Sequence, residues 1–420
     1  MRKYLLFVTI FFIVLNLHAQ MNDYGVAQKF QTFYNRQQTD SIFSLFSPMM
    51  KEKLPLEKST AVFSGLHVQM GDMKSLSFTK QDSGFTRYKA DFTNQTFTML
   101  LAVNKDGLMD GIRFVPYVPD PSAEEKADSK SNFILKTNTG NIYGTLKFQT
   151  GIEKTPVVLI VPGSGPIDRN GNGSSNLKTN SYKQLADSLM NSGIATLRYD
   201  KRGLGESIQA ASQTDSTFKQ EINDVEEFIQ MLRSSNRFSK IIVLGHSEGS
   251  LQGMIAAVHG HADGFISVSG AGEPIDKTIE RQLNALSPAL AVKATNIFDS
   301  LSKGFSVNPD PELVLVFNPS SEPYFRSWLK YNPVIEIKKL KKMPVLIVQG
   351  NTDLQVRVKD AQLLKEALPG AKLVIIDQMN HVLKQSGIDS KSNTATYSDP
   401  ALPLKSELVK TIETFVLSIN

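Results

Sequence analysis

The sequence predicts an α/β fold, in which a helical cap is inserted into a domain built on a mostly parallel sheet, and a small α+β domain precedes both. Length is the first reason, because 420 residues exceed what one ordinary hydrophobic core accommodates. Second, apolar strands alternate with amphipathic helices across residues 132–420, a pattern that requires a parallel sheet covered on both faces. Third, helices followed by alternating strands across residues 20–117 are typical of an α+β domain.

Residues 1–19 have the composition of a secretory signal peptide. Arg2 and Lys3 precede an apolar run over residues 4–17, and Ala19 supplies a small residue at the expected cleavage point before Gln20. The run is short for a spanning helix, so we expect no stable membrane span after cleavage, and an uncleaved anchor is the alternative. The sequence therefore predicts a secreted or periplasmic protein. The absence of cysteine excludes disulfides and a lipidated N-terminal cysteine.

The charge balance argues against a nucleic-acid partner. The net charge of +5 falls to +3 when the signal peptide is removed, because Arg2 and Lys3 leave with it. No basic stripe interleaved with aromatic residues occurs. The densest lysine cluster, over residues 338–342, is interpreted as a solvated face before a buried strand.

Residues 20–117 are expected to form the small α+β domain. Val26, Phe30, Phe33 and Tyr34 recur at helical spacing, and a second helical stretch covers residues 41–46. Alternating or apolar segments then predict strands at 76–80, 85–92, 96–103 and 108–115.

This segment resembles the nuclear-transport-factor-like cone domains found ahead of some secreted hydrolases. The resemblance rests on the order of elements and not on a sharp motif. His67, the only histidine in the segment, has no partner at a recognisable spacing and is interpreted as structural. Residues 118–131 have the composition of a linker.

Residues 132–420 are expected to form the domain with the parallel sheet. A hairpin is predicted over residues 133–148. The strands that follow it are predicted at 157–161, 195–199, 241–244, 265–268, 345–348 and 373–376. Helices are predicted at 182–191, 218–232, 251–258, 358–368 and 406–417. The alternation is interrupted at about 272–342, and we interpret this interval as a mainly helical cap whose aromatic residues form its own core.

The segment Gly245–Gly249 reads Gly-His-Ser-Glu-Gly and separates a β-branched apolar strand from a helical sequence. A strand, a sharp turn and a helix form the context in which this pattern indicates a nucleophilic serine, here Ser247. Glycines are needed because the turn leaves no room for side chains two residues either side of the serine. A purely structural turn is the alternative interpretation.

A serine hydroxyl needs a histidine to take its proton, and the imidazole needs a carboxylate to hold it. Asp353 comes just beyond one predicted strand and His381 just beyond the next, so the order is Ser, acid, His. His259 and His261 sit at the end of the helix that follows Ser247, and beyond them His381 is the only histidine. Asp360 and Asp377 are alternative acids, but the first lies within a predicted helix and the second at the end of a strand.

This order and spacing resemble the α/β-hydrolase superfamily over about residues 133–420, and most closely its secreted carboxylesterases with Gly-His-Ser-Glu-Gly at the serine. The resemblance implies Ser247 as nucleophile, His381 as general base and then acid, and Asp353 as the orienting acid. The oxyanion hole would use the backbone N–H of Glu248 and a second N–H from the loop 162–166, with Ser164 preferred and Gly165 next. The side chain of Glu248 is interpreted as structural or solvated.

Three further segments carry weaker signals. Residues 199–207 resemble the family's Asp-x-x-Gly-x-Gly-x-Ser turn, and we expect them to shape a loop near the site. Residues 168–173 match the opening of a calcium loop, but Thr179 stands where a bidentate Glu is needed, so a flexible Asn/Gly loop is favoured. Residues 384–405 form a long loop of unassigned role.

Together these features predict a serine hydrolase acting on small carboxylic esters, with no metal or organic cofactor implied. A serine peptidase or amidase acting on short peptides uses the same machinery, and an inactive hydrolase-fold binding protein is a further alternative. The natural substrate and the oligomeric state stay open at this stage.

Overall fold

The structure is a computed structural model that describes residues 23–82, 84–117, 132–149, 151, 154–173, 177–210, 217–314, 316–317 and 319–419. The predicted signal peptide and the predicted linker lie outside the described residues. The chain divides into two compact units. The first takes in the described residues up to Tyr117 together with Pro309–Leu315, and the second takes in the rest. Pro309–Leu315 comes from within the interval 272–342.

The first unit consists of helices followed by an antiparallel sheet. A helix covers residues 23–35, and three more follow: α2 (Thr39–Ser44), α3 (Pro48–Lys53) and α4 (Leu56–Met70). The strands are β1 (Met73–Asp82), β2 (Phe85–Phe92), β3 (Thr96–Val103) and β4 (Met109–Pro116), paired in sequence order. All three pairings are antiparallel.

Alternation buries one face of this sheet. In β2 every second side chain is buried, including Tyr88, Ala90 and Phe92. These residues join Phe30 and Phe46 from the helices in a core of their own. The sequence indicated no partner for His67, but the structure provides one: Nε2 of His67 lies 3.0 Å from Oδ1 of Asp72.

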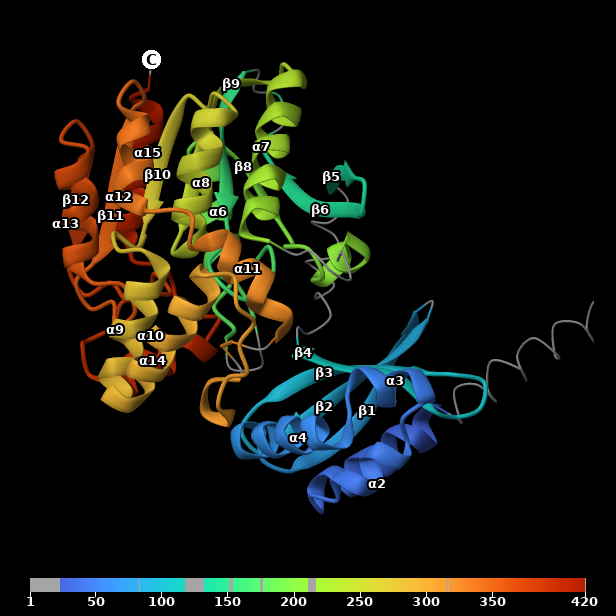
Figure 1. The fold of residues 1–420 in the computed structure, drawn as a ribbon. Coiled ribbons are helices and arrows are strands. Elements are labelled where there is room, and N and C mark those ends of the chain that lie inside the picture. Colours follow the sequence, from blue (N-terminus) through green and yellow to red (C-terminus); the bar gives the residue numbers. More distant parts are fainter. Residues whose placement is uncertain are drawn as a thin grey trace, which may run out of the picture. The chain divides into compact units, whose positions relative to one another are not determined.

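In the second unit, eight strands form one sheet within the described residues, in the order β12-β11-β10-β9-β7-β8-β6-β5 (Figure 1). Their bounds are β5 (Asn132–Thr137), β6 (Gly140–Lys147), β7 (Thr155–Val161), β8 (Ala195–Tyr199), β9 (Phe238–His246), β10 (Gly264–Val268), β11 (Val345–Gly350) and β12 (Lys372–Ile376). The β5–β6 and β6–β8 pairings are antiparallel, and the others are parallel. The predicted α/β fold class is confirmed.

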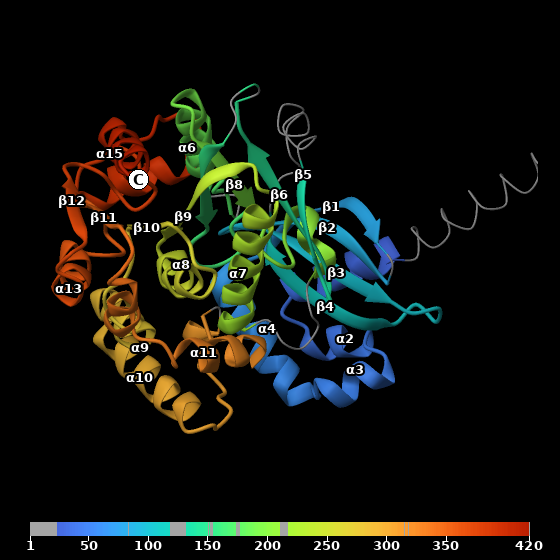
Figure 2. The same ribbon diagram turned by 90° about the horizontal axis from the view of Figure 1, so that it is seen from above.

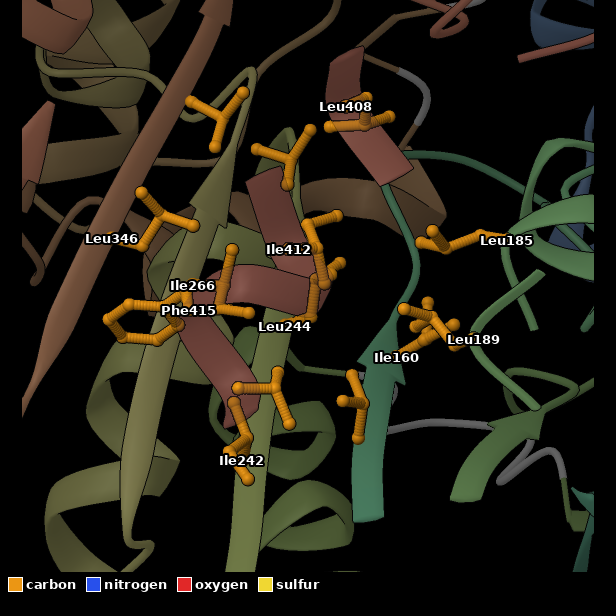
Figure 3. Packing of buried hydrophobic residues seen from close by; sticks show 14 of the residues in the cluster. Ile160, Leu185, Leu189, Ile242, Leu244, Ile266, Leu346, Leu408, Ile412 and Phe415 are labelled. Carbon is orange, nitrogen blue, oxygen red and sulfur yellow. The ribbon is translucent and has the colours of Figure 1, made fainter. Parts of the chain in front are cut away.

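Helices cover both faces of this sheet, as Figure 2 shows. One face carries α6 (Ser181–Asn191) and α15 (Ser406–Leu417). The other carries α7 (Phe218–Ser234), α8 (Glu248–His259) and α13 (Val358–Ala367). Leu185 and Leu189 of α6 pack with Ile412 and Phe415 of α15 against strand residues such as Ile266 (Figure 3). Because both faces are buried, the central strands are apolar throughout instead of alternating.

The order of the strands determines where a site can lie. The chain moves outward from β7 to β8 and then returns to the other side of β7 to form β9. Val161 at the end of β7 pairs with Gly245 at the end of β9, so the loops that follow these strands diverge from neighbouring positions. Such a reversal opens a crevice at the carboxyl ends of parallel strands, where ligands bind in α/β sheets.

The interval between β10 and β11 is mainly helical, as predicted. It contains α9 (Ile275–Leu286), α10 (Pro288–Ser302), α11 (Glu322–Trp328) and α12 (Pro333–Glu336), with short 3₁₀ turns between them. Figure 1 shows α9, α10 and α11 gathered at one end of the sheet. Phe298, Phe317, Phe325 and Trp328 are buried and contact one another in a chain, so they form the core of the cap.

No helix in the described part of the chain has the length and hydrophobicity needed to cross a membrane.

Candidate active site

Ser247 lies on the turn between β9 and α8, in a backbone conformation that serine rarely adopts. Its φ is 55° and its ψ is −121°. A Cβ on Gly245 would overlap the carbonyl of Gly249, and a Cβ on Gly249 would overlap the carbonyls that end β7. The two glycines are therefore required by close backbone approach. Strain of this kind is retained where it serves function, because it costs about 1–3 kcal/mol.

Asp353 and His381 are brought together at the carboxyl ends of β11 and β12. Nδ1 of His381 lies 2.8 Å from Oδ2 of Asp353, and both side chains are almost fully buried. The other carboxylate oxygen of Asp353 accepts backbone N–H bonds from Gln355 (2.8 Å) and Val356 (2.9 Å). Burial alone would raise the pKa of Asp353, but the charge and hydrogen bond of His381, together with these N–H groups, hold it below its usual value.

The two alternative acids are occupied elsewhere. Asp360 is buried and accepts backbone N–H bonds from Gly272 and Arg357. Asp377 accepts from the side-chain amide of Asn351. The geometry thus favours Asp353 as the partner of His381. Within the described residues, Ser247 makes no side-chain hydrogen bond to His381, a bond that is often long in unliganded hydrolases and tightens with substrate.

The loop after β7 passes close to Ser247. A Cβ on Gly163 would lie 3.3 Å from Cβ of Ser247. The N–H of Gly163 donates to the hydroxyl of Tyr182 (3.0 Å), and Pro162 and Pro166 have no N–H to donate. Among residues 162–166, the predicted oxyanion donors Ser164 and Gly165 remain. Their N–H groups have no acceptor within the described part of the chain.

The third predicted donor is the N–H of Glu248, the first residue of α8. The first N–H groups of a helix have no partner inside the helix and lie at its positive dipole end. This N–H is therefore available to an oxyanion formed at Ser247.

His246 joins the oxyanion loop to the backbone of His381, a role that the sequence analysis did not predict. Its Nδ1 lies 2.7 Å from the hydroxyl of Tyr182, and its Nε2 lies 2.9 Å from the carbonyl oxygen of His381. Because the carbonyl oxygen of His381 can only accept, the proton of neutral His246 resides on Nε2, and the Tyr182 hydroxyl donates to Nδ1. Burial and the neighbouring charge of His381 lower the pKa of His246 to about 3, so it stays neutral.

Lys201 lies in a buried charged cluster that includes Glu248, the residue after Ser247. Its ammonium is 2.9 Å from Glu221, 3.1 Å from Glu248 and 3.3 Å from the carbonyl oxygen of Gly163. Burial would lower the pKa of Lys201, but the two carboxylates raise it above its usual value, so the lysine stays charged. The side chain of Glu248 is thus structural; the solvated alternative is wrong.

The cap completes this cluster. The hydroxyl of Tyr324 in α11 lies 2.6 Å from Oε1 of Glu248 and 3.0 Å from Oε2 of Glu221. The amide of Gln252 donates to the same two oxygens at 2.9 and 2.7 Å. Burial raises the pKa of Tyr324 well above its usual value, so its hydroxyl keeps its proton and acts as a donor.

The loop that resembled a calcium site uses its oxygens for its own backbone. Oδ1 of Asp168 accepts the N–H groups of Asn170 and Asn172, both at 2.8 Å. Oδ1 of Asn172 accepts those of Thr179 and Asn180. Within the described residues, no group of three or more His, Asp or Glu side chains is placed to hold a metal ion.

The loop over residues 384–405 is ordered by contacts to the site. It contains α14 (Ser390–Ala395), and Asn393 donates to the carbonyl of Thr352 (2.8 Å), next to Asp353. Asn380, which precedes His381, donates to Thr396 (2.6 Å). This loop therefore supports the two segments that carry Asp353 and His381.

The chain is similar to two protein families and to a curated esterase. The family described as "Serine aminopeptidase, S33" matches residues 176–385, half of the chain, and a family of unknown function, DUF3887, matches residues 27–112. Esterase EstD from Thermotoga maritima is 24% identical over 361 residues, covering 82% of this chain and 84% of that protein.

Among solved structures, Est1E from Butyrivibrio proteoclasticus with ferulic acid bound is 18% identical, with a TM-score of 0.46, over 68% of this chain and 98% of its own. A bromoperoxidase from Bacillus anthracis is 17% identical, with a TM-score of 0.44, over 69% and 100%.

Proposed function

The chain belongs to the serine aminopeptidase S33 family of the α/β-hydrolase superfamily, and we propose that it hydrolyses small carboxylic esters through an acyl-enzyme on Ser247. The observation that carries the proposal is the buried hydrogen bond between His381 and Asp353, at the same sheet edge as the strained serine. A neutral imidazole held in this way presents its free Nε2 as a base.

The reaction follows from these positions. His381 takes the hydroxyl proton of Ser247 as the oxygen attacks the ester carbonyl, and the carbonyl oxygen becomes an oxyanion. The N–H of Glu248 and that of Ser164 or Gly165 stabilise this charge. The imidazolium then protonates the departing alkoxide and leaves an acyl-serine. Water, deprotonated by His381, attacks the acyl-serine, and the bond to the Ser247 oxygen breaks as the imidazolium returns its proton to that oxygen, which releases the acid and restores the serine.

Esters are proposed over amides because the curated relative that covers most of the chain is named an esterase. An amide needs its nitrogen protonated before it can leave, whereas an alkoxide departs more readily. The second candidate is cleavage of aminoacyl or short peptide amides, which the description of the matched family favours.

Export is part of the proposal. It is supported by the basic, apolar and small-residue sections of residues 1–19, with Ala19 before Gln20. Expression of the full chain in a bacterial host should yield a processed protein in the periplasm or medium whose N-terminus is Gln20. A full-length N-terminus recovered with the membrane fraction would favour the uncleaved anchor.

The activity is tested by comparing nitrophenyl esters of graded acyl length with aminoacyl and dipeptidyl anilides. We expect ester turnover to exceed anilide turnover. Ser247→Ala should lower it at least a thousandfold and abolish labelling by a fluorophosphonate. Ester hydrolysis by this variant within tenfold of wild type would rule out the proposed mechanism, and an unlabelled, inactive wild type would favour the binding-protein alternative.

A further inference from the structure

Lys201 is a buried cation whose position is not explained by the steps of ester cleavage. Its side chain is 6% exposed, and it reaches both the oxyanion loop and α8. A buried ammonium is costly to retain unless it is paired, and Glu221 and Glu248 supply the pairing. A well-packed apolar side chain would avoid this cost, so the contact that the ammonium makes beyond its two carboxylates is informative.

That contact is with the carbonyl oxygen of Gly163. The carbonyl of residue 163 and the N–H of residue 164 belong to one planar peptide unit, and in a trans peptide they point in opposite directions. No cis peptide bond occurs in the described chain. Holding the Gly163 oxygen at 3.3 Å from Lys201 therefore directs the N–H of Ser164 away from the lysine. The charge also polarises the peptide and makes this N–H a stronger donor.

The preceding peptide is held independently. The N–H of Gly163 donates to Tyr182 at 3.0 Å, so the loop is clamped at two successive peptide units. Tyr182 and Lys201 thus leave the direction of the Ser164 N–H little freedom. Preorganised donors stabilise an oxyanion without having to reorient during the reaction.

The same ammonium also contacts the residue that supplies the other donor. Glu248 contributes its backbone N–H at the start of α8, and its carboxylate accepts from Lys201 at 3.1 Å. One cation therefore ties the loop after β7 to the helix after β9. These two segments diverge from neighbouring strands, and Ser247 lies between them.

We propose that Lys201 is the positioning residue of the oxyanion hole, which sets the direction of the Ser164 N–H through Gly163 and its separation from the Glu248 N–H. The role rests on the proposed function, since it concerns the same reaction. Tyr324 of the cap closes the cluster over the two carboxylates, so the oxyanion hole is stabilised in part by a residue of the cap.

The test compares Lys201→Met with a matched variant at the same turn, Arg202→Met. The Arg202 side chain is equally buried and pairs with Asp224 through two bonds of 2.6 Å, but it makes no hydrogen bond or ion pair with residues 162–166 in the described structure. The measurements are kcat and KM for a nitrophenyl ester, the inhibition constant of a trifluoromethyl ketone that forms a tetrahedral adduct, and the melting temperature.

Lys201→Met should lower kcat about 10- to 100-fold and leave KM within about threefold. This loss of kcat does not exceed the loss expected when an oxyanion-hole donor is removed outright. Affinity for the ketone should fall by a factor similar to that in kcat/KM, because the adduct carries the oxyanion. Arg202→Met should have a lower melting temperature than the wild type but a kcat within about threefold of the wild-type value. Should Lys201→Met fail to fold, Glu248→Gln removes the negative charge that pairs with Lys201 with little change in shape, and it should lower kcat and ketone affinity together.

Three results would overturn the proposal. The first is a Lys201→Met or Glu248→Gln enzyme with kcat and ketone affinity within threefold of wild type. The second is an equal loss of kcat in Lys201→Met and Arg202→Met at equal loss of melting temperature, which would make the role structural. The third is a wild type that neither hydrolyses esters nor reacts with a fluorophosphonate. That third result needs no variant, and it would refute the proposed function itself as well as the role of Lys201.

Discussion

At the scale of single residues, the bond between Asp353 and His381 determines which imidazole nitrogen carries the proton. The ionised carboxylate accepts from Nδ1–H, so Nε2 is left as the free base. Gln349 also donates to Oδ2 of Asp353 at 3.1 Å, and two backbone N–H groups hold the other oxygen. The carboxylate is thereby fixed in orientation as well as in charge.

Asp353→Asn removes this acceptor while keeping the shape of the side chain. We expect kcat for ester hydrolysis at neutral pH to fall about 10³- to 10⁴-fold with KM little changed, because the imidazole loses its tautomer preference. Asp360→Asn is the control, since Asp360 is buried but contacts other backbone groups. An equal loss in the two variants would remove the assignment of Asp353.

His246 makes a separate prediction about stability and pH. Its pKa is about 3 in the folded protein and about 6.5 in an unfolded chain, so the unfolded state binds one more proton between these values. The stability that neutral His246 contributes is therefore present above pH 6.5 and is lost as the pH falls toward 3.

His246→Gln lacks this titration. As the pH falls from 6 to 4, the unfolding constant of the wild type should rise relative to that of the variant by up to about tenfold per pH unit. Denaturant unfolding of both proteins at pH 7, 6, 5 and 4 measures the difference, in which shared titrations cancel. Parallel stability curves for the two proteins would contradict the burial of a neutral His246.

Sequence and structure differ in what they reveal at this scale. Ser247, Asp353 and His381 each follow a strand, so residue type and local position together were enough to nominate them. The structure brings the last two into contact. His246 and Lys201 were missed because their partners are distant: Tyr182 lies 64 residues from His246, and Glu248 lies 47 residues from Lys201. No local pattern encodes such pairings.

At the scale of elements, the turn between β9 and α8 depends on backbone approach more than on side chains. Gly245 faces the carbonyl of Gly249, so an added methyl group would have to displace the backbone there. Gly245→Ala should therefore abolish soluble expression or lower the free energy of unfolding by about 3 kcal/mol or more. Gly370→Ala is the matched control, because its Cβ would meet open space and its φ is ordinary. Equal thermal stability of the two variants would show that the turn can adjust.

The elements themselves were predictable to different degrees. The strands β2, β3 and β8 and the helix α15 have the predicted bounds, because their apolar patterns are strong and turns or polar residues flank them. The 15-residue helix α4 was missed. Its buried face includes Ser59 and Gly65 beside Phe63 and Met70. Small residues therefore occupy positions where a helical pattern of large apolar residues would have indicated a helix.

At the scale of the whole molecule, a hydrophobic core of the first unit and one of the second share no residue among those described. One joins the helices and sheet of the first unit, and the other joins the parallel sheet to α6 and α15. The existence of two domains followed from length and from the change of rhythm near residue 132. The assignment of Pro309–Leu315 to the first unit could not be predicted, because it depends on tertiary packing and the segment lies in the interval that the sequence indicates as a cap.

Two independent cores should unfold as two cooperative transitions. Phe30 is fully buried in the first core against Phe63 and Phe114, and Ile412 is fully buried in the second. Phe30→Ala should lower the stability of the first unit by about 3–5 kcal/mol, and Ile412→Ala that of the second by about 2–5 kcal/mol. Scanning calorimetry, with ester hydrolysis followed in parallel, should show each variant shifting one transition. If both variants shift a single shared transition by similar amounts, the two units unfold as one cooperative structure, because independent cores cannot respond to each other's cavities.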